Sequence, residues 1–280
     1  AAVGSVQFFL DGKALGAPVT KPPYAVSWNT REAADGSHTL TATAIDTSGN
    51  VGNATPVEVT VENPAEEGPC FVMDVNTTVN GRNTVTTPTF TTAEAGEQLF
   101  AFVASDGPAG AGMQSAKVSG AGLAWTLVTR ANSQSGDAEI WTATATKQLK
   151  GKKVKSKLAA KGFDQSLTVI SMQMSKGAGA SVAGGAPSGA PSVSLTTTED
   201  GTLVYAVGSD WSSATARTLG SNQVILRQDL DAGFGKTFWS QYTGHVTGMA
   251  GETVTLDDTA PTGDQWNMAA VEILGDGLGN

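Results

Sequence analysis

The chain has only one cysteine and two histidines among its 280 residues, and these shortages exclude several kinds of chemistry. Cys70 has no partner within the chain, so no intrachain disulfide can form. The two distant histidines, His38 and His245, cannot build a His/Cys zinc site with one cysteine. Neither a Gly-x-Ser-x-Gly nucleophile elbow nor a phosphate-binding P-loop occurs. The sequence therefore indicates no catalytic residue.

Long apolar runs and positive charge are also scarce. No run approaches the roughly 20 apolar residues that a membrane-spanning helix needs, so we expect no membrane insertion. Charged residues make up 15% of the chain, and the formal net charge is −9. Because phosphate binding needs a basic surface, we also expect no nucleic-acid partner. Ala1 fits either a removed leader or a trimmed fragment, and both explanations stay open.

The chain is rich in glycine, short apolar runs and alternating polarity. Glycine reaches 34 residues and apolar residues 40%, which is too apolar for a disordered protein. Helical periodicity is almost absent, and period-two alternation between turn residues dominates. These features predict an all-β protein. A turn-rich composition without disulfides suits a bacterial extracellular or cell-surface protein.

One strand pattern occurs twice in the larger part of the chain. Residues 151–174 align with residues 251–274 without a gap. Further matches are two apolar runs that end in Ser-Asp (99–106 and 203–210) and two tryptophans (Trp141 and Trp239). Such self-similarity indicates two copies of one supersecondary unit. We therefore predict a larger jelly-roll-like antiparallel β-sandwich built from two similar halves.

The sequence divides into a short first domain, a linker and a large second domain. In residues 1–62, turn residues separate expected strands near 5–10, 24–29, 37–45 and 55–62. Residues 63–69 hold two prolines and two acids, which predicts a linker. The second domain spans 70–276, with repeat one at about 71–175, a surface crossover at 176–191 and repeat two at about 192–276.

The first domain resembles the bacterial Ig-like domains of secreted and cell-surface proteins. Four motifs carry the resemblance, at residues 6–12 (VQFFLDG), 23–30 (PYAVSWNT), 35–42 (DGSHTLTA) and 44–50 (AIDTSGN). It implies a spacer role and a partial Ig-like β-sandwich, because family members carry one or two more strands before the first motif. A trimmed fragment, a shorter domain or strands supplied by another chain would each explain this, the last by self-association through the incomplete domain.

Residues 71–275 resemble a β-sandwich module that follows Ig-like domains in large bacterial extracellular proteins. The similar stretches are residues 122–128 (GLAWTLV), 138–143 (AEIWTA) and 264–273 (DQWNMAAVEI). No activity is established for that module. The resemblance therefore implies an extracellular location and an accessory character only.

Aromatic side chains give the clearest functional signal, because sugar rings stack on aromatic faces. Trp211 stands at a strand end where the first repeat has Gly107, and Trp266 stands where the first repeat has Ser166. Residues that only one copy carries are the best candidates for function. With neighbouring polar groups, the predicted ligand-binding set is Trp211, Trp266, Asp210, Asp264, Tyr242 and His245.

Calcium is the one cofactor that the sequence suggests, because carboxylates on loops are its usual ligands. The best clusters are Asp229 with Asp231, and Asp257 with Asp258. Neither cluster has the spacing of an EF-hand or of a nonapeptide repeat. Two ordinary acidic turns are the plainer explanation.

The first repeat also carries a lysine-rich strand. Alternation places Lys153, Lys155 and Lys157 on one face, and the aligned residues of the second repeat are uncharged or acidic. These lysines either guard a sheet edge in solvent or form a charged contact face. The partner of such a face would be an anionic glycan or a neighbouring subunit.

Three functions follow from these features. The first is a non-catalytic extracellular accessory module that binds a polysaccharide or cell-surface glycan and is held on an Ig-like spacer. The second is a structural subunit of an adhesin or filament, with strand complementation between chains. The third and weakest is a polysaccharide-active enzyme, since two carboxylates suffice for glycoside hydrolysis but nothing in the sequence selects a pair.

Overall fold

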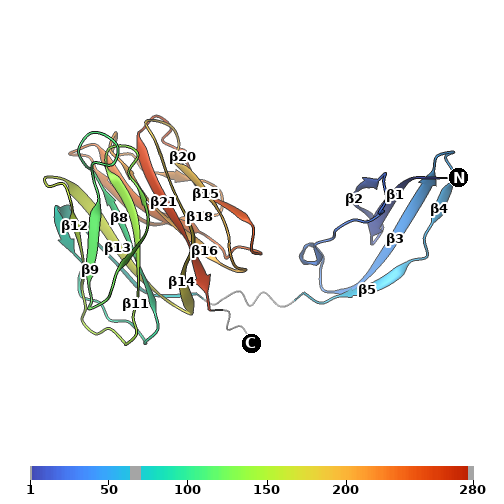
Figure 1. Cartoon of the computed structure of the whole chain (residues 1–280), viewed down its shortest axis with the longest axis horizontal. Helices are drawn as coiled ribbons and strands as arrows, with labels where there is room; N and C mark the ends of the chain where they lie inside the picture. The colour runs from blue at the N-terminus through green and yellow to red at the C-terminus, as the bar shows by residue number, and fades with distance from the viewer. Residues whose placement is uncertain (1, 64–70, 277–280) are drawn as a thin grey trace. The chain divides into compact units, whose positions relative to one another are not determined.

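The computed structural model describes residues 2–63 and 71–276, and the chain divides into two compact units, Ala1–Glu67 and Gly68–Asn280 (Figure 1). Apart from one 3₁₀ turn at Thr30–Glu32, all regular structure in the described residues is antiparallel β-sheet. The all-β prediction is therefore confirmed. Cys70 and all of the predicted linker except Asn63 lie outside the described residues.

The first unit is one five-stranded sheet. Its strands are β1 (Val3–Leu10), β2 (Lys13–Val19), β3 (Gly36–Asp46), β4 (Val51–Asn53) and β5 (Val57–Val61). The strands predicted near 5–10, 37–45 and 55–62 are present. The segment predicted near 24–29 is not a strand. Instead β2, which was not predicted, forms a hairpin with β1 that turns through Asp11 and Gly12, at φ 49° and 78°.

Two carboxylates hold the Ig-like motifs in place. Asp46 Oδ1 accepts hydrogen bonds from the backbone N–H groups of Ser48 and Asn50, both at 2.8 Å. Hydrogen bonds, first from the side chain of Asn50, hold the pKa of Asp46 below its ordinary value. Asp11 Oδ1 likewise accepts the backbone N–H of Thr39 at 2.8 Å. Asp46 therefore closes the turn of its own motif, whereas Asp11 ties its turn to the third motif.

One face of the first unit is open. An apolar groove of about 480 Å³ is lined by side chains that include Phe8, Leu15, Tyr24, Trp28, Leu40 and Val57. Val61 is the only buried apolar residue in the described part of this unit. In a complete Ig sandwich a second sheet covers such a face. The unit is thus a partial Ig-like sandwich, as predicted.

The second unit consists of two halves in succession. The first half holds β6 (Val72–Arg82), β7 (Thr84–Thr86), β8 (Gln98–Ser105), β9 (Ala116–Gly120), β10 (Thr126–Ala131), β11 (Asp137–Thr144), β12 (Val154–Leu158) and β13 (Asp164–Gln173). The second half holds β14 (Ser175–Ala186), β15 (Ser192–Thr196), β16 (Leu203–Asp210), β17 (Thr218–Leu219), β18 (Gln223–Asp231), β19 (Lys236–Thr243), β20 (Thr253–Ala260) and β21 (Trp266–Gly275).

Both halves have the same strand order. Each forms a five-stranded sheet, β10-β11-β8-β13-β6 or β18-β19-β16-β21-β14, and a three-stranded sheet, β7-β12-β9 or β15-β20-β17. The predicted duplication is therefore confirmed for the architecture. The predicted antiparallel β-sandwich of two similar halves is present, and each half is itself a sandwich of two sheets.

The two halves pack through their five-stranded sheets. One apolar cluster joins residues of both sheets, and Phe102 stacks on Tyr205 across it with ring centroids 5.8 Å apart. Separate clusters fill the space between the five- and three-stranded sheets of each half. The second unit thus has four layers. Since the inner sheets are covered on both faces, every residue of β16 is buried, which explains its continuous apolar sequence.

The gap-free alignment of the two repeats is only partly in register. Val154 and Val254 both face the inner core of their own half. Val169 also lies in the inner core of the first half, whereas its aligned residue Ala269 faces the other half. Successive side chains of a strand point to opposite faces. The structural register of the two copies therefore shifts by an odd number of residues between position 154 and position 169.

The glycine- and alanine-rich stretch predicted as a surface crossover at 176–191 is mostly strand. β14 pairs along its length with β21 and forms an edge of the second five-stranded sheet. The small residues of β14 allow neighbouring side chains to approach its backbone closely. A Cβ on Gly185 would lie 2.5 Å from Ser133 Oγ, and one on Gly179 would collide with the carboxylate of Glu272.

Candidate functional site

Loops from both halves meet near the ends of β8 and β16. Lys236, at the start of β19, is buried with 1% of its surface exposed. Its Nζ lies 2.8 Å from Asp106 Oδ2 and 2.5 Å from Asp164 Oδ2, both in the first half. A third carboxylate, that of Asp231, lies 3.7 Å from the same Nζ. One ammonium group therefore connects the two halves.

Burial and charge oppose each other in this cluster. Removal from water raises the pKa of Asp106, although hydrogen bonding to Lys236 acts to lower it. For Lys236, removal from water lowers the pKa, but the hydrogen bonds to Asp106 and Asp164 outweigh this and leave it raised. The ammonium group consequently stays charged at neutral pH.

The loop at residues 132–136 of the first half also docks on the start of β21. Gln265 Nε2 and Asn267 Nδ2 both donate to the Ser135 carbonyl, at 3.0 and 3.2 Å. The backbone N–H of Gln134 in turn donates to Asn267 Oδ1 at 3.0 Å. The two halves thus share polar contacts at this end as well as an apolar interface.

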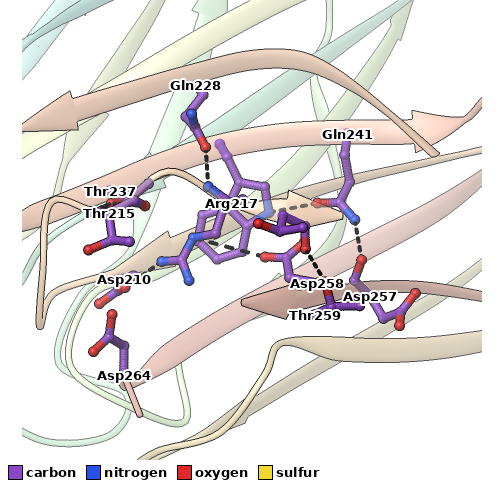
Figure 2. Close-up of polar contacts among 12 residues, drawn as sticks. Asp210, Thr215, Arg217, Gln228, Thr237, Gln241, Asp257, Asp258, Thr259 and Asp264 are labelled. Atoms are coloured by element: carbon purple, nitrogen blue, oxygen red, sulfur yellow. Dashed lines mark hydrogen bonds and ion pairs between the residues drawn. The ribbon is translucent and has the colours of Figure 1, made fainter. Parts of the chain in front are cut away.

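A second buried cation, Arg217, lies in the second half (Figure 2). Its Nη2 donates to Asp210 of the five-stranded sheet, and its Nε lies 3.9 Å from Asp258 Oδ2 of the three-stranded sheet. The guanidinium carbon is 4.2 Å from the centroid of a Trp239 ring. Arg217 therefore ties the two sheets of this half together where the loop from β16 returns to β17.

Burial raises the pKa of both carboxyl groups beside Arg217, although the arginine acts to lower both. The pKa of Asp210 reaches about 6 and that of Asp258 about 7. Their exposed fractions are 0% and 2%, so neither reaches a ligand in solvent. Asp210, predicted to bind ligand, instead holds Arg217 and accepts the backbone N–H of Ser212 at 2.6 Å. A glycosidase role for these two acids has no support in this geometry.

Two exposed aromatic rings lie on the loops that this network holds. Trp211 begins the loop after β16 and is 37% exposed, and Phe234, in the turn between β18 and β19, is 65% exposed. The loop lies against the start of β19, directly after that turn, because Thr237 Oγ1 donates to the Ser213 carbonyl at 2.9 Å. Polar groups accompany the rings, since Ser213 Oγ donates to Asp264 Oδ2. We call Trp211, Ser212, Ser213, Phe234 and Asp264 the loop-end surface.

Of the predicted ligand set, the structure brings Trp211 and Asp264 together on the loop-end surface. The sequence analysis missed Phe234. Its flanking glycines, Gly233 and Gly235, could have indicated an exposed ring, but the preceding aspartates drew attention to calcium instead.

The structure does not place Trp266 on the surface, which the predicted ligand binding requires. Its side chain is 7% exposed and belongs to the inner core of the second half. The sequence analysis compared Trp266 with Ser166, but the two residues are not structurally equivalent. Because the register differs between the copies, Ser166 lies opposite Ala104, on the side facing the other half. A ring buried in this way cannot present its face to a sugar.

Tyr242 and His245 lie away from the loop-end surface. In the β16–β19 pair, Asp210 is opposite Thr237 and Tyr205 is opposite Tyr242. Five residues of strand therefore separate Asp210 from the level of Tyr242, or about 17 Å. Tyr242 stacks on Tyr205 with centroids 4.9 Å apart, and His245 is exposed beyond the end of β19. The predicted set is thus divided between two ends of the sheet.

The residues of the two predicted calcium clusters lie on β18 and β20. No group of three or more His, Cys, Asp or Glu side chains in residues 2–63 and 71–276 is placed to hold a metal ion. Asp229 and Asp231 lie on β18, and Asp231 is near Lys236. Asp257 accepts a hydrogen bond from Gln223 at 2.6 Å, whereas Asp258 is buried beside Arg217 on the other face of β20. Asp231, Asp257 and Asp258 thus each lie beside a partner group within the chain.

The predicted lysine face is exposed but does not guard an edge. On β12, Lys155 and Lys157 are exposed and alternate with buried residues. β12 is the central strand of its sheet, so edge protection does not explain these lysines. Lys157 lies directly opposite Lys117 of β9, which the sequence analysis did not include.

Two buried acids on β11 form a further polar group that the sequence did not single out. Glu139 Oε1 accepts from Arg130 Nε at 2.6 Å and from the Ala116 N–H at 2.7 Å, and its Oε2 accepts from Trp141 Nε1 at 2.5 Å. Asp137 is also 0% exposed, and Arg130 Nε lies 4.0 Å from its Oδ1. Burial, and then the charge of Glu139, raises the pKa of Asp137 well above its ordinary value.

Comparison with known proteins identifies one region. Residues 1–42 match the bacterial Ig domain family, so the N-terminal segment is bacterial Ig-like. Bacterial Ig domains typically occur in extracellular or surface proteins. No curated protein matches the chain. Among the described residues, no helix has the length and apolar character needed to cross a membrane.

Proposed function

We propose that the chain is a non-catalytic binding module of an extracellular or cell-surface protein and that its loop-end surface binds carbohydrate. The observation that carries this proposal is the presence of two exposed rings, Trp211 and Phe234, on neighbouring segments joined by the hydrogen bond from Thr237 to Ser213. Sugars place their C–H faces on aromatic rings and their hydroxyl groups on polar side chains. Ser213 and Asp264 supply such polar groups beside the rings.

Buried ion pairs support the proposal because they hold both loops before a ligand arrives. Asp210 and Arg217 bracket the loop that carries Trp211. Lys236 anchors the turn of Phe234, and its Nζ lies 4.7 Å from the centroid of that ring. A surface that is ordered in advance loses less conformational entropy when it binds.

We further propose that each half is a jelly roll. Counted from the start of a half, its strands pair in the orders 1-8-3-6-5 and 2-7-4, with antiparallel neighbours throughout. Lectin domains are among the proteins built this way. Since a fold alone does not specify a ligand, the argument for carbohydrate still rests on the two rings.

Affinity electrophoresis of the full chain in gels that contain soluble polysaccharides tests the proposal. At least one polysaccharide is expected to retard the chain, and Trp211→Ala or Phe234→Ala to weaken that binding about tenfold. Met249→Ala is the matched control, because Met249 is 51% exposed and lies beyond the far end of β19. Retardation that survives the Trp211→Ala/Phe234→Ala double variant would contradict the site, and no retardation by any polysaccharide would contradict the ligand class.

The open groove of the first unit favours a second function, that of a structural subunit completed by a strand from a second copy. Light scattering over a range of concentrations is then expected to show self-association. Val57→Asp places a charge in the groove and is expected to abolish it, whereas Val51→Asp, at a similarly exposed position outside the groove lining, is not. A chain that remains monomeric throughout would exclude this function.

A further inference from the structure

Four lysines share the solvent side of the three-stranded sheet in the first half. Lys155 and Lys157 point outward from β12, and Lys117 lies directly opposite Lys157 on β9. Lys153 immediately precedes β12, and all four are exposed. We call these residues the lysine face.

The lysine face lacks neutralising partners within the described chain. None of its four residues forms an ion pair with a described acid. The strands β7, β9 and β12 contain no Asp or Glu. Like charges that lie opposite each other on neighbouring strands are destabilising. A chain with 26 acids and 17 basic residues thus keeps a locally unbalanced positive surface.

The second half shows that the architecture does not require these lysines. On the corresponding sheet the outward positions of β20 include Thr253 and Thr255, and β15 presents Ser192, Ser194 and Thr196. Ser194 Oγ and Thr255 Oγ1 are hydrogen-bonded at 2.7 Å. Asp257 follows on the same face of β20, so one sheet order carries a hydroxyl and acidic surface in one half and a cationic surface in the other.

The geometry of the lysine face suits an extended polymer. Outward residues recur about every 7 Å along a strand, and neighbouring strands lie about 5 Å apart. Thr86 and Thr84 of β7 flank Lys155 and Lys157, so that hydroxyl groups stand beside the ammonium groups. Flexible ammonium groups bind carboxylate or sulfate as point charges and need no fixed fork geometry.

We propose that the lysine face binds a linear anionic polysaccharide, one that carries carboxylate or sulfate groups along its length, over the strand β12. Charge complementarity is the argument for this partner. The strands β7, β9 and β12 carry no aromatic residue, so this binding would rest on charge and not on ring stacking as at the loop-end surface.

Titration of the full chain with polygalacturonate and with dextran sulfate, beside neutral dextran, tests this inference. Binding of at least one anionic polymer is expected at low salt, with loss at high salt and none to neutral dextran. The variant Lys117→Thr/Lys155→Thr/Lys157→Thr replaces three ammonium groups by hydroxyl groups, as Thr255 does at the position of Lys155, and is expected to bind about tenfold more weakly. Its circular dichroism and urea midpoint check that it folds.

The control Lys13→Gln/Lys21→Gln/Lys147→Gln removes the same charge at exposed positions elsewhere and is expected to bind as the unchanged chain does. Equal weakening in both triple variants would show a net-charge effect and overturn the site. Absence of binding to both anionic polymers would overturn the partner, as would equally tight binding to duplex DNA or to anionic vesicles. Trp211→Ala is expected to leave polyanion binding intact, which separates this inference from the proposed function.

Discussion

The ammonium group of Lys236 lies 2.8 Å from the carboxylate of Asp106 and so connects the second half of the large unit to the first. The side chain of Lys236 is 2% exposed and that of Asp106 8%. Removing one partner of a buried ion pair leaves the other charge without compensation, which commonly costs about 3 kcal/mol or more. This contact is therefore expected to contribute strongly to the cohesion of the two halves.

Lys236→Met is predicted to lower the free energy of unfolding of the second unit by about 3 kcal/mol, because Asp106 and Asp164 lose their shared cation. Urea unfolding followed by tryptophan fluorescence measures this. Lys147→Met, at an exposed position, is expected to change stability by less than about 0.5 kcal/mol. Adding Asp106→Asn and Asp164→Asn to Lys236→Met is expected to recover part of the loss. Equal stability of the two lysine variants would refute the prediction.

Asp258→Asn is predicted to become more stable relative to the unchanged protein as the pH rises. The pKa of Asp258 is about 7 in the folded protein, against an ordinary value of 3.8. The folded state therefore holds a proton that the unfolded chain releases, so the favourable contribution is complete below about pH 4 and is lost as the pH rises through 7. Urea unfolding measures the free energy of unfolding of both proteins between about pH 5 and 8. The value for the variant minus that for the unchanged protein is expected to grow by on the order of 2 kcal/mol as the pH rises.

Glu272→Gln provides the control of opposite sign in the same unit. Burial acts to raise the pKa of Glu272, but hydrogen bonds from Ala180 and Thr198 outweigh it and leave the pKa lowered. Its stabilising contribution is present above the ordinary pKa of 4.5 and is lost as the pH falls through the lower folded value. The advantage of the unchanged protein over this variant is therefore expected to shrink below about pH 4. If the difference in unfolding free energy between each variant and the unchanged protein does not vary with pH, the raised pKa of Asp258 and the lowered pKa of Glu272 are both contradicted.

Asp137→Asn and Glu139→Gln are predicted to differ sharply although they neutralise neighbouring buried acids. Glu139 accepts three hydrogen bonds, so its replacement is expected to cost about 2–4 kcal/mol. Asp137 is raised in pKa by burial and by the charge of Glu139, and a neutral amide is expected to be tolerated there or to stabilise the protein above pH 7. Thermal unfolding at about pH 8 compares the two, and similar losses would contradict this reasoning.

Gly208→Ala is predicted to destabilise the second half by about 3 kcal/mol, because a Cβ at this position would collide with the Trp239 ring. Gly263→Ala is the matched control, since no atom lies within 4 Å of a Cβ built there. The two urea midpoints provide the measurement. Coinciding midpoints would show that the Trp239 ring can move away from Gly208, and would contradict this prediction.

The strands of the large unit could be predicted because local patterns determine them. Continuous apolar runs become strands covered on both faces, as in β8 and β16, and alternating runs become strands with one exposed face, as in β12. β14 escaped prediction because glycine and alanine carry little strand preference of their own. Its pairing with β21 holds it extended, and that is a tertiary effect.

The candidate site was harder to predict because the relevant properties depend on registers and burial. Trp211 was recognisable from its position at a strand end, and it is exposed. Trp266 looked equivalent in sequence, but an odd slip between the copies turns its ring into the inner core. Whether an aspartate binds a ligand or an internal arginine, as Asp210 does, depends on contacts that no local pattern contains.

The apolar face that each half turns toward the other has a consequence for how the chain can be divided. One residue, Met174, separates β13 from β14, so the covalent link between the halves is short and exposed. A single half would leave Phe100, Phe102 and Ile140 in water and could persist only by pairing with another copy. The large unit thus resembles a dimer whose two subunits are joined in one polypeptide. Two fragments produced by cleavage at Met174 are expected to associate and restore the folded unit.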